Sequence, residues 1–301
     1  MSRLEELLDL DVLRHYDRLA LHVRRGMGDR PGDRRFPGHP HTSGTEVESY
    51  VSYTPGDDVR HLDWNALGRL DTLLVRRFTA EREVPIHLLI DCSASMSLPA
   101  RDGKYARAIE LAMALGYLGL SSNDAVRAVL LTAQGPRASR VLRQRPGAVA
   151  LAQLLGEATA EGALDLGSAL AEYASSRSAP GVIIVLSDFM AEVPAIEPGV
   201  AALRSRNHDV HLIQIVGQGE LDPTRDFASG VLRDVESGAT HAVQLTPASL
   251  ASYASLLEEH FAALTRLATA TGASYLRVTS DVAAADIVTG DLARLGLVRR
   301  R

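Results

Sequence analysis

From residue 84 onward, short apolar runs alternate with stretches of helical pattern, and this alternation constrains the fold more than any other feature. The apolar runs predict strands at residues 85–90, 125–132, 181–186 and 210–216. The stretches between them predict helices at residues 104–120, 147–158, 166–174 and 196–206. An unbroken apolar run such as 181–186 is typical of a central parallel strand. The order predicts an α/β fold class with a doubly wound, mostly parallel sheet.

Smaller elements flank this core. Before it, residues 2–23 predict a helix, and residues 46–53 and 73–78 predict strands. After residue 216 we expect a hairpin at 231–235 and 241–245, a helix from the Thr246 N-cap to Gly272, a strand at 274–278, a helix at 281–295 and a solvated tail. We therefore expect an N-terminal helix and β extension over residues 1–83 that packs on a domain over 84–301, with a hairpin insertion near 229–245.

Composition excludes several classes of protein. The chain has 301 residues, a formal net charge of −5 and one cysteine, so no strong field attracts nucleic acid and no intramolecular disulfide forms. We find no signal peptide and no charge-free run of about 20 apolar residues, so no membrane segment is expected. A cytoplasmic protein is the default expectation. The basic stretch over residues 24–35 has no assigned role.

The pentad D-C-S-A-S at residues 91–95 follows the predicted strand 85–90. In an extended chain, side chains two residues apart point the same way, so Asp91, Ser93 and Ser95 can converge on one point. One carboxylate and two hydroxyls suit Mg²⁺ or Mn²⁺. The alternative is a serine-rich turn that caps a helix.

A metal site at Asp91 needs ligands from other strand ends. Asp188 follows the run 182–186 with Ser187 between, which places it at the same sheet edge as Asp91 if the two strands are parallel. Asp165 precedes the predicted helix 166–174. A cap is the alternative for both aspartates, and for Asp165 the helix N-cap is the favoured interpretation.

These three segments resemble a von Willebrand factor A domain. The resemblance implies a metal-ion-dependent adhesion site, with Asp91, Ser93 and Ser95 as the first, partner-facing segment and Asp188 in the third. It implies Mg²⁺ (or Mn²⁺) with one open position for a partner's carboxylate. Leu164 stands where the family has a threonine ligand, so Asp165 or water substitutes, or the metal site is weakened.

A second signature, YTPGDDVRHLDW, covers residues 53–64. It contains a Pro-Gly turn, a possible Arg60–Asp63 ion pair and the only tryptophan, Trp64, as a candidate anchor to the core. The segment strongly resembles the Y-x-x-G-D-x-x-R-x-I-D-W signature of the bacterial domain-of-unknown-function 58 family. The matching residues are Tyr53, Gly56, Asp57, Arg60, Asp63 and Trp64. Later segments resemble the family too, so the likeness spans most of the chain.

The resemblance implies a non-enzymatic protein-interaction adaptor with a Mg²⁺-dependent site. The partners that it implies are a MoxR-type AAA+ ATPase and an unknown client protein whose assembly or maturation the adaptor assists. Two alternatives stay open. One is a metal-free interaction scaffold, suggested by Leu164. The other is a metal-dependent hydrolase or phosphotransferase with Asp91 as nucleophile or ligand. Lys104 is then the candidate cation, although we expect it to be solvated on its helix face.

Overall fold

The computed structural model describes residues 7–8, 10–22, 47–55, 59, 62–78, 83–176, 178–225, 229–235 and 238–300. The chain divides into two compact units, one made of Met1–Asp29 with Val84–Arg301 and the other of Arg30–Glu83. The predicted division at residue 83 differs from this one, because the first helix belongs to the larger unit. None of the helices in the described part of the chain is both long and apolar enough to cross a membrane.

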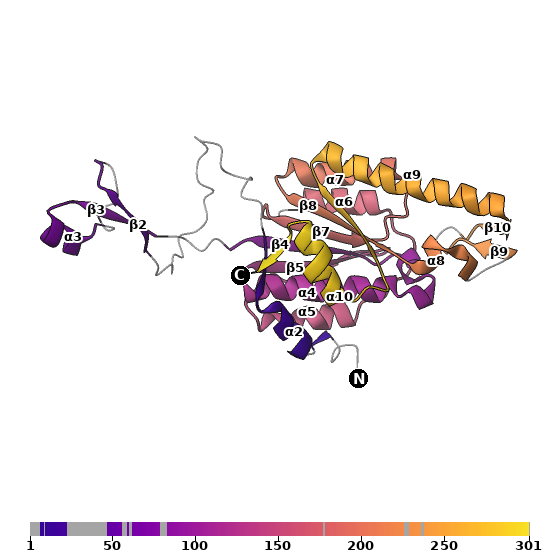
Figure 1. The fold of residues 1–301 in the computed structure, drawn as a ribbon, viewed down its shortest axis with the longest axis horizontal. Helices are drawn as coiled ribbons and strands as arrows, with labels where there is room; N and C mark the ends of the chain where they lie inside the picture. The colour runs from indigo at the N-terminus through magenta and orange to yellow at the C-terminus, as the bar shows by residue number, and fades with distance from the viewer. Residues whose placement is uncertain are drawn as a thin grey trace. The chain divides into compact units, whose positions relative to one another are not determined.

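A six-stranded sheet forms the centre of the larger unit (Figure 1). Its strand order is β11-β8-β7-β4-β5-β6. All neighbours pair in parallel except β6, which is antiparallel to β5 and was not predicted. The strands are β4 (Pro85–Asp91), β5 (Ala125–Thr132), β6 (Gly135–Ala138), β7 (Val182–Ser187), β8 (Asp209–Val216) and β11 (Ser274–Thr279).

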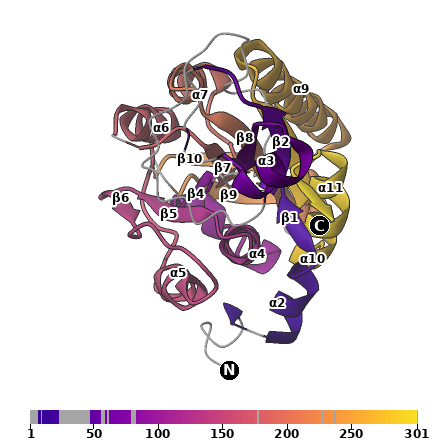
Figure 2. The ribbon, with the colours of Figure 1, turned by 90° about the vertical axis from the view of Figure 1, so that its left-hand side faces the viewer.

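Helices cover both faces of this sheet, which confirms the predicted doubly wound α/β class (Figure 2). One face carries α4 (Lys104–Ser121) and α5 (Gly147–Gly156), and the other carries α6 (Leu166–Ser175), α7 (Val193–Ser205) and α9 (Pro247–Thr271). Successive strand residues point to opposite faces. Leu88 and Ile90 therefore join the α4 cluster, whereas Leu89 joins the α6 cluster.

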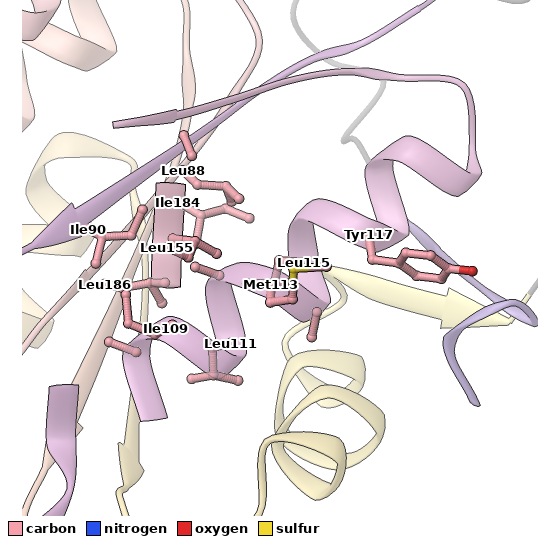
Figure 3. Close-up of a cluster of buried hydrophobic side chains, with 14 of the residues drawn as sticks. Leu88, Ile90, Ile109, Leu111, Met113, Leu115, Tyr117, Leu155, Ile184 and Leu186 are labelled. Atoms are coloured by element: carbon pink, nitrogen blue, oxygen red, sulfur yellow. The ribbon is translucent and has the colours of Figure 1, made fainter. Parts of the chain in front are cut away.

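Helix α4 is buried over most of its surface because it packs against both the sheet and α5. Figure 3 shows Ile109 of α4 beside Leu186 of β7, and both belong to the buried cluster on this face. Burying one such side chain contributes about 1.5–3 kcal/mol. The packing on this face fixes where β4, β7 and the start of α4 lie relative to one another.

The N-terminal helix is shorter than predicted. Helix α2 (Leu10–Tyr16) is followed by β1 (Leu19–Leu21), which pairs antiparallel with β12 (Val298–Arg300). Leu19 and Leu21 are buried while Ala20 between them is only partly buried, which is the period of a strand. The tail predicted to be solvated therefore has a paired backbone at Arg299 and Arg300, although both side chains are exposed.

The predicted hairpin is confirmed as β9 (Ser229–Arg233) paired with β10 (Thr240–Gln244). Helix α9 begins and ends as predicted, because the Thr246 side chain caps it and Gly272 ends it at a φ of +71°. The helix predicted at 281–295 is divided into α10 (Ala284–Asp286), a π segment (Ile287–Asp291) and α11 (Leu292–Arg294). Short helix α8 (Gln218–Leu221) and the 3₁₀ turns Ala94–Ser97, Ala100–Asp102 and Pro223–Arg225 were not predicted.

The smaller unit contains the hairpin of β2 (Val47–Ser52) and β3 (Leu74–Phe78), with α3 (Trp64–Leu70) between them in sequence. The Asp63 carboxylate caps α3 by accepting from the backbone N–H groups of Asn65 and Ala66. The Tyr53 N–H donates to the Leu73 carbonyl. Trp64 is 65% exposed at the start of this helix, which Asp63 caps and which buries none of its residues. Whether Trp64 anchors the segment to the core concerns the other unit and stays a prediction. Gly56, Asp57 and Arg60 lie outside the described residues.

Helices α6 and α7 approach closely enough that only glycine fits at the contact. A Cβ atom on Gly199 would lie 2.4 Å from the Gly167 carbonyl oxygen, and one on Gly167 would lie 1.9 Å from the Ala195 oxygen. Both neighbours are backbone atoms, which cannot rotate away. The α6–α7 pair therefore depends on these glycines.

We expect Gly199→Ala to lower the free energy of unfolding by about 2 kcal/mol or more, because the added methyl group forces the two helices apart. Gly156→Ala is the matched control, since a Cβ there meets no atom within 4 Å. The control should change stability by less than about 1 kcal/mol, in the stabilising direction. Urea denaturation of both variants measures the difference, and equal effects would contradict the packing argument.

His87 is a buried polar residue of β4 on the face that carries α6. Its Nε2 lies 3.0 Å from the Ala179 carbonyl oxygen and its Nδ1 lies 2.8 Å from the Tyr173 hydroxyl. Burial, with a smaller contribution from the neighbouring His208, lowers its pKa to about 4, against the hydrogen bond to Ala179. The folded protein therefore holds His87 neutral at pH 7.

This depressed pKa predicts acid sensitivity. As pH falls from 6.5 towards 4, the unfolded chain takes up a proton that native His87 does not, so stability present above pH 6.5 is lost. The loss amounts to about 3 kcal/mol at most. His87→Gln should flatten the dependence of the unfolding free energy on pH across this window. Denaturant titrations between pH 4.5 and 7 test this, and an unchanged slope would argue against His87 as its source.

Candidate functional site

The pentad lies where β4 ends, and its three polar side chains form one hydrogen-bonded group. Asp91 is 3% exposed, and its Oδ1 accepts from the Ser93 backbone N–H at 2.8 Å. The Ser93 and Ser95 hydroxyl oxygens are 2.9 Å apart. Ser93 precedes the 3₁₀ turn Ala94–Ser97 but makes no side-chain cap, so its hydroxyl is directed to Ser95 instead. Asp91, Ser93 and Ser95 thus lie together, as their spacing predicts.

Asp188 lies at the same sheet edge, because β4 and β7 are parallel neighbours. The Ser187 hydroxyl donates to Asp91 Oδ2 at 2.5 Å, which joins the two strand ends directly. Asp188 is 2% exposed, and its Oδ1 accepts from the Met190 N–H at 3.2 Å. Buried Gln214 donates from Nε2 to the Asp188 carbonyl at 2.7 Å and so fixes the backbone of this strand end.

The turn after Asp188 is strained and well supported. Phe189 is buried with a φ of +50°, which a bulky residue rarely adopts. Its N–H donates to the Ser187 hydroxyl oxygen at 2.9 Å, and His260 Nε2 donates to its carbonyl at 2.8 Å. Strain of this kind persists where surrounding contacts hold it, and it concentrates at functional sites.

Lys104 is the residue that sequence reasoning misplaced. It was expected to be solvated, but it is 1% exposed. Its Nζ donates to Asp188 Oδ2 at 2.9 Å and also donates to Glu220 Oε1 of α8. Burial alone lowers the lysine pKa, but the Asp188 and Glu220 carboxylates outweigh burial and raise the pKa, which keeps the ammonium charged.

One sequence signal points to this burial. Lys104 is the first residue of α4, where the helix dipole disfavours a positive charge. The rest of that helix is mostly apolar. A lysine in such a position indicates a compensating carboxylate nearby, although the sequence does not reveal which one.

Asp91 has a different electrostatic environment from Asp188. Burial, followed by repulsion from Asp188, raises the Asp91 pKa to about 6, against hydrogen bonds from Ser187 and Ser93. Within the described ranges, no lysine or arginine forms an ion pair with it. Hydroxyl and amide donors therefore stabilise this carboxylate in place of a contacting cation.

Asp165 acts as the N-cap of α6, as its alternative interpretation predicts. Its Oδ1 accepts from the Ser168 N–H at 3.0 Å and its Oδ2 accepts from the Ser168 hydroxyl at 2.7 Å. The backbone bond from Ser168 is the largest cause of its lowered pKa. Leu164 packs against the core on the α6 face of the sheet.

The loop before α6 nevertheless reaches the pentad through its backbone. The Ala94 N–H donates to the Gly162 carbonyl at 2.8 Å, and the Glu161 N–H donates to the Cys92 carbonyl at 2.9 Å. The three predicted segments therefore lie together. Both Asp165 oxygens nevertheless accept from Ser168.

The side chains do not fit the full divalent-ion site that the resemblance implies. Asp91, Ser93 and Ser95 supply hard oxygen donors suited to Mg²⁺. The other two carboxylates are engaged, since Lys104 holds Asp188 and Ser168 holds Asp165. In the described part of the chain, no group of three or more His, Cys, Asp or Glu residues is placed to hold a metal ion. Binding of Mg²⁺ or Mn²⁺ stays a prediction.

Comparison with known proteins identifies the family. Residues 49–262 match the family described as "Protein of unknown function DUF58". This chain belongs to the DUF58 family. Its sheet with helices on both faces and the pentad at the end of β4 make the fold von Willebrand factor A-like, as predicted.

Relatives of this DUF58 chain include "Uncharacterized protein Rv1480" of Mycobacterium tuberculosis (strain ATCC 25618 / H37Rv). The two are 27% identical over 277 residues, which cover 90% of this chain and 80% of the relative. Similar solved structures include the conserved hypothetical protein BatB from Bacteroides thetaiotaomicron, with 15% identity and a TM-score of 0.40 over 71% of this chain and 98% of that one. The SpRpn10 VWA domain has 10% identity and a TM-score of 0.36 over 69% of this chain and 94% of that one.

The buried ion pair predicts strong coupling between its partners. Lys104→Met should lower the free energy of unfolding by about 3–5 kcal/mol, because it leaves Asp188 and Glu220 without the ammonium. Adding Asp188→Asn should recover part of this loss, since one uncompensated charge is removed. Denaturation of both single variants and the double variant forms the thermodynamic cycle. Additive losses would show that the two side chains are not coupled.

Proposed function

We propose that this DUF58 protein is a non-enzymatic interaction adaptor that works with a MoxR-type AAA+ ATPase in the assembly or maturation of a client protein. The family resemblance supplies the identity of this partner. The observation that carries an interaction role is a set of exposed apolar side chains on α8, the β9–β10 hairpin and α9. We call this set the hairpin–helix surface; its members are Leu221, Val231, Leu232, Val235, Tyr253 and Leu256.

Two members of the hairpin–helix surface are the most exposed large apolar side chains in the described part of the larger unit. Val231 is 68% exposed on β9 and Leu256 is 65% exposed on α9. Adjacent Val231 and Leu232 point to opposite faces of a two-stranded hairpin, and both are exposed. Figure 1 shows β9, β10 and the start of α9 at one end of the larger unit. The hairpin therefore exposes apolar side chains on both of its faces, which supports the proposal that a partner protein covers it.

A chain of contacts joins this surface to the buried ion pair. The Tyr253 hydroxyl donates to the Glu220 carbonyl at 2.7 Å. The Glu220 carboxylate accepts from Lys104, which in turn donates to Asp188. A partner that covers Tyr253 therefore lies near the edge formed by Asp91, Ser93 and Ser95, which we propose as the second part of the interface.

The hydrolase or phosphotransferase alternative has less support. Its candidate cation, Lys104, is buried and donates to two carboxylates, so it is not placed to meet a substrate phosphate. Asp91 is hydrogen-bonded through both oxygens to Ser93 and Ser187. These contacts hold Asp91 in place and favour a structural or binding role over a nucleophilic one.

We expect Leu256→Glu to weaken binding of the purified MoxR-type ATPase at least tenfold, because a charge would be buried at the contact. Val149→Glu is the matched control, since Val149 is a 49% exposed apolar residue on a helix outside the hairpin–helix surface. Biolayer interferometry with immobilised DUF58 protein measures both affinities. Equal binding by wild type and Leu256→Glu would remove this surface from the proposal.

A further inference from the structure

We propose that the Lys104 ammonium is the resident cation of this sheet edge, so that the edge works without a bound divalent metal ion. The inference concerns the site named in the proposed function and rests on that function only for the partner. Its structural part stands on the contacts of Lys104 alone. The inference favours one alternative from the sequence analysis, the metal-free interaction scaffold that Leu164 suggested.

The first argument is the position of the charge. Lys104 Nζ lies 2.9 Å from Asp188 Oδ2, and Asp188 was the carboxylate expected to support a metal ion. The side chains of both residues are at most 3% exposed. A divalent ion bound to the same oxygen would meet a buried ammonium at close range, and no bulk water screens that repulsion. The lysine and a metal ion therefore exclude each other at Asp188 Oδ2.

The second argument is that the fold holds the lysine in place from two sides. Lys104 also donates to Glu220, whose other oxygen accepts from the Gly217 N–H at 2.8 Å. Asp102, in the turn before α4, accepts from the Gly219 N–H at 2.8 Å and ties α8 to the same region. Hydrogen bonds of the backbone N–H groups at residues 217 and 219 therefore hold Glu220 next to Lys104. A built site of this kind does not require an external ion for its assembly.

The third argument is the donor set that remains. Leu164 supplies no oxygen, and Asp165 uses both of its oxygens on Ser168. Of the three aspartates predicted as ligands, Asp91 is then the one left beside the Ser93 and Ser95 hydroxyls. Mg²⁺ in proteins is usually held by one or two carboxylates together with substrate phosphates. Because Lys104 holds Asp188, the remaining carboxylate and two hydroxyls form a weak metal site.

Titration with Mn²⁺, followed by electron paramagnetic resonance and calorimetry, tests the proposal. Wild type and Lys104→Arg should bind no Mn²⁺ with a dissociation constant below about 1 mM, which is weaker than typical sensor sites. Lys104→Met should gain one Mn²⁺ site, and Asp188→Asn in the same background should abolish it. Submillimolar binding to wild type that is lost in Asp91→Asn would overturn the proposal, as would a folded Lys104→Met variant without the gained site.

A variant that fails to fold does not remove the test. If circular dichroism shows Lys104→Met to be unfolded, the wild type decides: a melting temperature unchanged between excess Mn²⁺ and chelator supports Lys104, and a Mn²⁺-dependent rise that Asp91→Asn abolishes overturns it. Failure to capture the ATPase contradicts the proposed function but leaves the Mn²⁺ comparison intact. The two ideas therefore fail by different measurements.

Discussion

The pairing of one buried ammonium with two carboxylates is the constraint on which the candidate site depends. A charge removed from water is tolerated only when opposite charges and hydrogen bonds surround it. Lys104 satisfies this condition with Asp188 at the end of β7 and Glu220 on α8. The start of α4, the end of a central strand and a short helix after β8 are thereby held at one place. Each of these elements carries or adjoins a residue of the proposed interface.

The sheet supplies the rest of the site through ordinary packing. Parallel β4 and β7 end at the same edge, so Asp91 and Ser187 meet although they lie far apart in sequence. Hydrophobic alternation predicts this outcome, because strands buried on both faces between helices leave few other arrangements. Alternation made the central strands predictable from sequence to within a few residues. Turn and cap residue types did the same for the hairpin and for the two ends of α9.

The missed features share a physical cause, which is that pairing over long sequence distances leaves little local signal. Residues 19–21 look like the end of an apolar helix until the strand at 298–300 is placed beside them. Lys104 looks like a surface lysine until β7 and α8 bring carboxylates to it. Asp165 illustrates a local rule, N-capping, that does decide a side chain's role.

The pairing of β1 with β12 has a consequence for how the protein is made. Almost the whole described chain separates the two strands, yet they form one small sheet against α4. During synthesis β1 leaves the ribosome early and has no partner until the last described strand emerges. Until then the backbone of residues 19–21 lacks the strand with which it pairs in the folded protein, and the Leu19 and Leu21 side chains are not yet buried beside it. The larger unit therefore closes late, and a nascent chain halted before residue 298 exposes an apolar edge that chaperones can bind.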